Sequence, residues 1–353
     1  MSASPRILAA LVATILFAAS VIAASRSSRL LGTQAANFWR IVVATFLLGA
    51  WGHTLGLGLG GGAFGLFFLS GVVGFGLGDY GLFEALPRLG PRLTSLMVNC
   101  LAAPFAAAIE WIWLDTRLSG PQALCGLVIL GGVALSLAPE GSAAGGCHEP
   151  ALTPSLARRT GEGAPATAGA GEGDSPRFRA PAPGPQTKAA SQARWAGILF
   201  GILAGFGQGL GAVLTRKAFA VAQAGGFGVD GGTAAYQRIL GGLAFVAFPY
   251  AWLLVQRHWR GDGASRRRLT APERRRAWGW VMANALAGPS LGVAFYQWAL
   301  KIAPSGIVLP VTAMAPLMVV PFTYLFEGDR PGWRSLAGGL LAVAGVIGLA
   351  FLR

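Results

Sequence analysis

Acidic side chains inside otherwise apolar stretches are the residues of this chain that most directly suggest chemistry. Asp79 lies a few residues from the middle of the apolar run 63–86, and Glu110 lies late in the run 93–114. A charge in hydrocarbon is costly, so such residues usually face a bundle interior or a watery cavity. Asp79 can bind a solute or carry a coupling proton, or it can pair with an arginine or a backbone donor between helices. For Glu110 we favour a structural role near the membrane interface.

Uncharged polar residues inside the apolar runs form a second group of candidates. Each can hydrogen-bond a solute in a cavity, and each can equally bridge two helices, which is the commoner role. Together with the two acids, the predicted substrate-binding set is Asp79, Tyr80, Asn99, Glu110, Gln208, Asn284, Tyr296 and Gln297.

Two arginines occupy matching positions near the starts of two apolar runs, in the segments Phe38–Ile41 and Tyr236–Ile239. The recurrence of Arg40 and Arg238 predicts a scaffold or interface role, in which the long side chains extend to lipid headgroups. A substrate role is the alternative, and an anionic substrate would favour it.

The composition is that of a membrane protein. The chain is 54% hydrophobic and only 12% charged, about half the charged fraction of an average soluble domain. The apolar runs have the length of membrane-spanning helices and do not alternate as barrel strands do. The predicted fold is therefore an all-α integral membrane protein with ten transmembrane helices, near 7–24, 35–52, 63–86, 93–114, 121–138, 195–214, 234–256, 278–300, 305–326 and 333–352.

An internal repeat divides the chain into two halves. Residues 85–137 and 299–351 run nearly in register, so that Pro91 matches Pro304 and Gly132 matches Gly345. Five spans per half would insert the second copy in the opposite direction, giving two inverted repeats. The predicted units are the repeats 1–138 and 195–353, joined by a disordered Pro/Gly/Ala-rich linker over 139–194.

Several functional classes find no support in the sequence. His53, His148 and His258 are scattered, so no metal or catalytic constellation is expected, and we predict neither an enzyme nor a cofactor. The glycine-rich stretch 56–65 lacks the lysine of a nucleotide-binding loop. The net charge of +14 comes mainly from basic residues in the loops, which argues against a nucleic-acid partner.

The run from Phe295 to Leu352 resembles the EamA family of the drug/metabolite transporter (DMT) superfamily. The resemblance rests on Ala299-Leu300, Pro304, Ala315-Pro316-Leu317, Gly328-Asp329-Arg330 and the glycines Gly338, Gly339 and Gly345, and the first half carries the pattern more loosely. It implies a secondary transporter of the cell (plasma or inner) membrane that moves a small metabolite or drug-like solute by alternating access, often as an exporter. Membrane lipid and the solute are the expected partners, with protons as a candidate coupling ion. The alternative is a non-transporting membrane scaffold or receptor on the same fold.

The membrane orientation stays open at this stage. Lys and Arg concentrate in the odd-numbered loops, above all in residues 257–277, which favours a cytoplasmic location for those loops. The family resemblance implies the opposite, with cytoplasmic termini.

Overall fold

The computed structural model describes residues 4–114, 119–137, 188–259, 269–302, 311–312, 314–328 and 331–352, and within these ranges all regular structure is helical. The helical elements are α1 (Ser4–Leu31), α2 (Thr33–Thr54), α3 (Phe64–Gly71), η1 (Val72–Gly78), α4 (Asp79–Leu114), α5 (Gly120–Leu137), α6 (Lys188–Ala224), α7 (Gly231–Trp259), α8 (Ala271–Ala285), η3 (Leu286–Gly292), α9 (Val293–Ile302), α11 (Ala315–Glu327) and α12 (Trp333–Phe351).

These helices have the length and composition of membrane spans. Among the described residues, six helical stretches are long and apolar enough to cross a membrane, and α11 and α12 are shorter apolar helices. One of the six stretches, Phe64–Trp113, is 50 residues long, whereas a single crossing needs about 20. It crosses twice, and α8, η3 and α9 together form a further crossing. The predicted all-α membrane fold with ten spans is confirmed.

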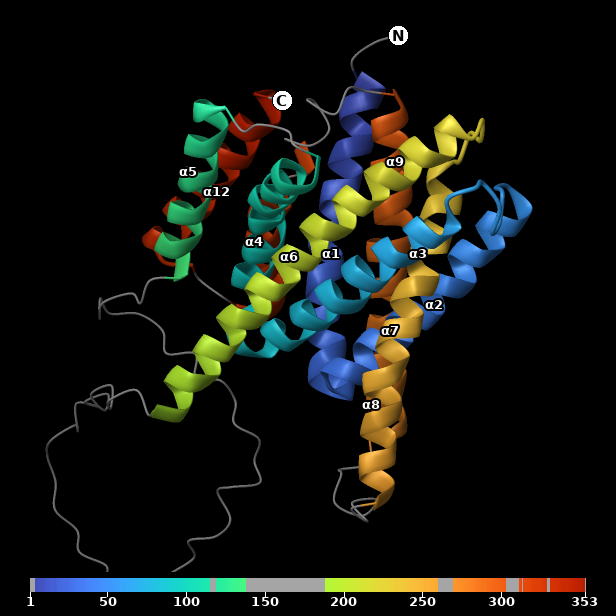
Figure 1. Ribbon diagram of the computed structural model, residues 1–353. Helices are drawn as coiled ribbons and strands as arrows, with labels where there is room; N and C mark the ends of the chain where they lie inside the picture. Colours follow the sequence, from blue (N-terminus) through green and yellow to red (C-terminus); the bar gives the residue numbers. More distant parts are fainter. Residues whose placement is uncertain are drawn as a thin grey trace, which may run out of the picture.

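The double crossing reverses at Gly90, inside α4. Gly90 has a φ of 77°, which glycine adopts without steric cost, and it lies between Pro87 and Pro91. Helix α6 packs along both legs of this hairpin (Figure 1). The third and fourth predicted spans therefore form a tight helical hairpin.

Glycines allow α6 to approach the hairpin closely on two faces. A Cβ atom on Gly205 would come within 2.8 Å of the Leu101 Cβ, and one on Gly209 within 2.7 Å of the Ala102 carbonyl oxygen. On another face, a Cβ on Gly207 would come within 2.7 Å of the Gly78 Cα. The small-residue stripe that begins at Gly201 is thus a packing surface, as its spacing predicts.

Two π-helical segments interrupt the bundle at matching places in the two halves. η1 and η3 are each seven residues long, which is unusual because π-helices are rare and cluster at functional sites. Asp79 follows directly after η1, and Val293 follows directly after η3. The pair is a structural feature of the repeat that the sequence did not reveal.

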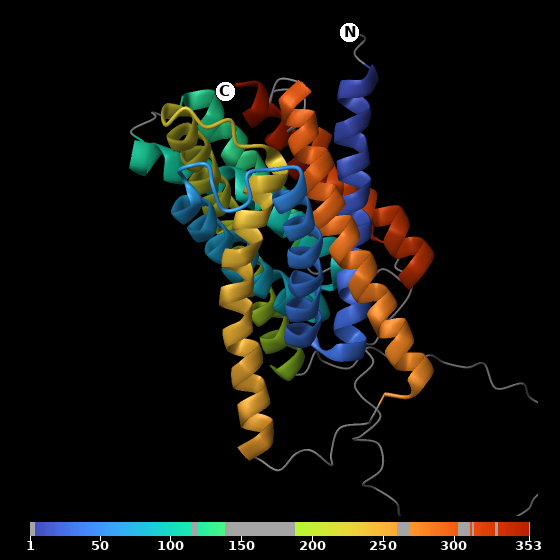
Figure 2. The same cartoon turned by 90° about the vertical axis from the view of Figure 1, so that its right-hand side faces the viewer.

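The two halves interleave instead of packing as separate bodies. α2 lies against α7, and the buried Ile41 and Ile239 meet in one hydrophobic cluster. α1 runs beside α8, η3 and α9 (Figure 2), while α5 and α12 pair at one edge (Figure 1). The start of α1 and the end of α12 lie at the same end of the bundle (Figure 1), as an even number of spans requires.

The glycine-rich loop 55–63 closes over the start of α7. Gln237 is fully buried, and its Nε2 donates hydrogen bonds to the carbonyl oxygens of Gly58 (3.0 Å) and Gly60 (2.7 Å). The Leu57 backbone N–H donates to the Thr233 hydroxyl at 2.9 Å. The loop is therefore held by side chains of the opposite half of the chain.

Asp230 caps the first turn of α7. Its Oδ1 accepts hydrogen bonds from the backbone N–H groups of Gly232 (2.8 Å) and Thr233 (3.0 Å). Burial by itself raises the pKa of Asp230, but these bonds, together with those from the side chains of Thr233 and Trp51, outweigh burial and hold the pKa below its usual value. The cap thus depends on the ionised carboxylate.

Predicted boundaries differ from the structure, most of all in α1 and α6. α1 spans Ser4–Leu31 and is longer than the predicted run 7–24. α6 begins at Lys188, before the predicted start at 195, because its first turns are polar and hydropathy does not detect them. Residues 138–187, which hold most of the predicted linker, lie outside the described residues.

Candidate functional site

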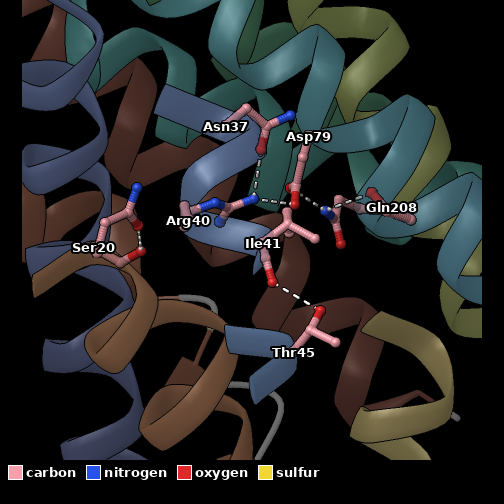
Figure 3. A network of polar contacts seen from close by, with 9 residues as sticks. Ser20, Asn37, Arg40, Ile41, Thr45, Asp79 and Gln208 are labelled. Atoms are coloured by element: carbon pink, nitrogen blue, oxygen red, sulfur yellow. Dashed lines mark hydrogen bonds and ion pairs between the residues drawn. The ribbon is translucent and has the colours of Figure 1, made fainter. Parts of the chain in front are cut away.

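A buried ion pair between α2 and α4 forms the centre of the polar interior. The Arg40 guanidinium donates through Nη2 to the Asp79 carboxylate and, at 3.0 Å, to the Asn37 Oδ1. On the other side of the carboxylate, Gln208 Nε2 on α6 donates to Asp79 Oδ1 at 3.3 Å. Figure 3 shows Arg40 pointing from α2 toward Asp79, with Gln208 beyond it. The network joins α2 and α4 of the first half to α6 of the second.

Local structure explains why these side chains meet. Asp79 is the first residue after η1, and the Gln208 Nε2 also lies 3.4 Å from the Gly74 carbonyl oxygen within η1. The close approach of α6 to η1 at Gly207 brings Gln208 into this position. The π-helical segment and the glycine contact therefore set the geometry of the network.

The pair is withdrawn from both lipid and water. Asp79 is 4% exposed and Arg40 is 6% exposed. Gln208 lies at the middle of the apolar stretch Ser191–Ala224, and the Phe83 ring covers the guanidinium at 5.0 Å. The prediction that Arg40 extends to the headgroups is wrong: a buried acid holds it inside the bundle.

Arg238, the counterpart of Arg40 in the second half, has a different environment. Its guanidinium lies over the Phe75 ring at 5.1 Å, and its buried Nε has no hydrogen-bond partner. Asp79 is near enough for its charge to act on this guanidinium, and the neutral Tyr296 hydroxyl lies in the same neighbourhood. Arg238 therefore lies beside the network without a hydrogen bond to it. Like Arg40, it does not extend to the headgroups.

A second polar contact joins α1 to α8. The Ser20 hydroxyl donates to the Asn284 Oδ1 at 2.7 Å, and Asn284 is fully buried. The Asn284 Nδ2 and the hydroxyl of Ser290 in η3 are buried without a partner. Asn284 thus bridges helices through one atom and keeps a donor unused.

Two predicted residues on α4 serve local structure. Tyr80 packs edge-on against Phe200, with ring centroids 6.1 Å apart. Asn99 donates to the carbonyl oxygen of Ser95 at 2.8 Å within its own helix. Neither residue joins the central network in this conformation.

Glu110 and Gln297 complete the predicted set. Glu110 forms an ion pair with Arg216, whose side chain is 65% exposed. Gln297 belongs to α9, but its side chain lies outside the described residues. The structure therefore brings together Asp79 and Gln208, and places Tyr296 near Arg238.

Sequence reasoning missed Arg40 and Asn37 as members of the site. Recurrence of an arginine in both repeats suggested a scaffold role, and that inference hid the pairing. A usable signal was present, since an acid and an arginine within the apolar runs of one half can neutralise each other. Within the described part of the chain, His, Cys, Asp and Glu form no group of three or more that could hold a metal ion.

Comparison with known families decides the class of this protein. The model of the EamA-like transporter family matches residues 4–138 and 195–351. The chain belongs to the EamA-like transporter family. It is accordingly a multi-pass membrane protein of the transporter type within the drug/metabolite transporter superfamily.

Solved structures support the same fold for this EamA-like protein. One structure, titled only "Crystal structure of protein", matches with a TM-score of 0.53 at 16% sequence identity and covers 99% of this chain and 98% of its own. At that identity the likeness shows the fold alone. No curated protein sequence matches the chain.

Proposed function

We propose that this EamA-like protein is a secondary transporter that exports a small metabolite or drug-like solute across the cell membrane by alternating access. The observation that carries the proposal is the buried network of Arg40, Asp79 and Gln208, with Arg238 beside it. Buried charge in a membrane bundle marks a substrate or ion path by default. In transporters built from inverted repeats, such sites lie near the midplane between the repeats.

The paired π-helical segments supply a place for the conformational change. η1 and η3 interrupt two equivalent spans, and each is followed directly by a conventional α-helix. We propose that each segment is a hinge about which one half of its span tilts. Because the segments are related by the repeat, bending one and straightening the other would open the site to opposite sides in turn.

Asp79 is the proposed coupling group. It holds Arg40 in place while ionised, and protonation would release the guanidinium toward a solute. Protons are therefore the proposed coupling ion.

The test is solute flux in proteoliposomes. Purified protein is reconstituted into vesicles that contain the low-mass fraction of a bacterial cell extract, and retained solutes are measured by mass spectrometry with and without a pH gradient. We expect the wild-type protein to release specific solutes faster than empty vesicles, and Asp79→Asn to remove both this release and its response to the gradient.

Glu110→Gln is the matched control, since it also removes an acid of an α4 ion pair, but one whose arginine is largely exposed. It should transport as the wild type does. Absence of solute-specific release from wild-type vesicles would contradict the transporter proposal and favour a scaffold or receptor.

A further inference from the structure

The centre of the bundle carries one more positive charge than negative charge. Arg40 and Arg238 both approach Asp79, which is the one acid that the described residues place there. The other acids with described side chains are engaged elsewhere: Glu84 pairs with Arg88, Glu110 with Arg216, and Asp230 and Glu273 cap helices. An unbalanced charge in a low-dielectric interior is costly, so a bound anion would stabilise this site.

The repeat shows where the missing negative charge would lie. Arg40 on α2 pairs with Asp79, the residue that follows η1. Arg238 occupies the equivalent position on α7, and the residue that follows η3 is Val293. Val293 packs against the hydrophobic cluster that contains Phe75, whose ring lies against Arg238. The second half thus keeps the arginine and lacks its acid.

Buried hydrogen-bond donors of the second half are unused. The Arg238 Nε, the Asn284 Nδ2 and the Ser290 hydroxyl are buried without partners. Asn284 and Ser290 belong to the α8–η3 segment that leads into Val293. Donors without acceptors suit a ligand that is rich in acceptor atoms.

We infer that the transported solute is an oxyanion of net negative charge, a carboxylate or phosphate compound, and that Arg238 binds its anionic group where the repeat lacks an acid. This inference rests on the proposed transport function. A guanidinium fits carboxylate and phosphate oxygens through two parallel hydrogen bonds. Among its described residues, the site offers no carboxylate to bind an ammonium group of a solute, because Asp79 already pairs with Arg40.

The charge of the released solutes tests the inference first. Vesicles of pure phosphatidylcholine are used, so that no anionic lipid can act as the ligand, and they are loaded with the low-mass fraction of a bacterial cell extract. Solutes that wild-type protein releases should be anions. Release of neutral, zwitterionic or cationic solutes alone would overturn the inference while leaving the transporter proposal intact. Absence of any release would instead count against transport itself.

A matched pair of variants tests the role of Arg238. Val293→Asp supplies the missing acid, and Val293→Asn adds a side chain of the same shape without charge. Since losing one partner of a buried charge pair typically weakens binding about 30-fold or more, Val293→Asp should reduce release of the anions by at least that factor. Val293→Asn should retain most of the release. Equal release by the two variants would overturn the assignment.

A second pair covers the case in which Val293→Asp does not fold. Arg238→Lys keeps the positive charge and Arg238→Gln removes it, and both variants have fewer hydrogen-bond donors than arginine. Release of the anions should persist in part with lysine and be lost with glutamine. If glutamine and lysine support the same release, Arg238 is not the anion receptor.

Discussion

Removing the acid of the central pair should cost much more stability than removing its arginine. In Asp79→Asn, Arg40 and Arg238 would remain together with no negative charge near them. In Arg40→Met, Asp79 would keep its hydrogen bond from Gln208 and the nearby charge of Arg238. The two changes break the same bond, but they leave different charge balances behind.

The expected losses of stability follow from the burial of the pair, since Asp79 is 4% exposed and Arg40 is 6% exposed. Leaving a buried charge without its partner costs about 3–5 kcal/mol, and we expect that loss in the free energy of unfolding for Asp79→Asn. For Arg40→Met we expect about 1–3 kcal/mol, the usual cost of an unsatisfied buried group. The double variant restores the wild-type net charge, so it should be more stable than Asp79→Asn alone.

The assay is denaturant unfolding of the purified proteins in detergent, followed by circular dichroism and extrapolated linearly. Glu110→Gln is the control, and it should change stability by no more than about 1 kcal/mol because its arginine is largely exposed. A cost for Asp79→Asn below that of Arg40→Met would refute the reasoning. So would a double variant whose loss equals the sum of the two single losses.

Three further outcomes test the packing and the loop closure. Gly207→Ala should destabilise the protein by about 1–3 kcal/mol, since its Cβ would meet the Gly78 backbone at 2.7–2.8 Å. The control is Gly279→Ala, which has open space around it and should be neutral or stabilising in the same unfolding assay. Gln237→Leu should leave two loop carbonyls unpaired and speed hydrogen exchange in residues 57–61, and unchanged exchange would count against the clamp. For Asp230, whose folded-state pKa is lowered, the stabilisation is present above the ordinary value of 3.8 and is lost as pH falls below it. The stability difference between wild type and Asp230→Asn should therefore disappear on acidification, and a difference that persists would contradict the assigned cap.

Much of the fold could be predicted because hydrocarbon imposes a simple rule. A span must be apolar over about 20 residues, so hydropathy alone located the ten crossings and the repeat related them. The polar first turns of α6 escaped detection because they lie before the apolar stretch.

The site could be predicted only in part. Asp79 and Gln208 were recognised from polarity within apolar runs, and they do share a network. The sequence allowed Asp79 to pair with an arginine, but it did not identify Arg40 as the partner, because that depends on which faces of α2 and α4 meet. The π-helical segments also escaped prediction, since no residue type specifies the wider turn and both segments depend on close packing against other helices.

The one-sided placement of the acid has an energetic consequence. Two identical inverted halves would make the two end states of a transport cycle mirror partners with equal free energies. Asp79 in one half and Val293 in the other remove that equality, because only one of the two states can be held by a pair such as Arg40 with Asp79. Under the proposed mechanism, this difference between the repeats therefore gives the empty protein a preferred resting side.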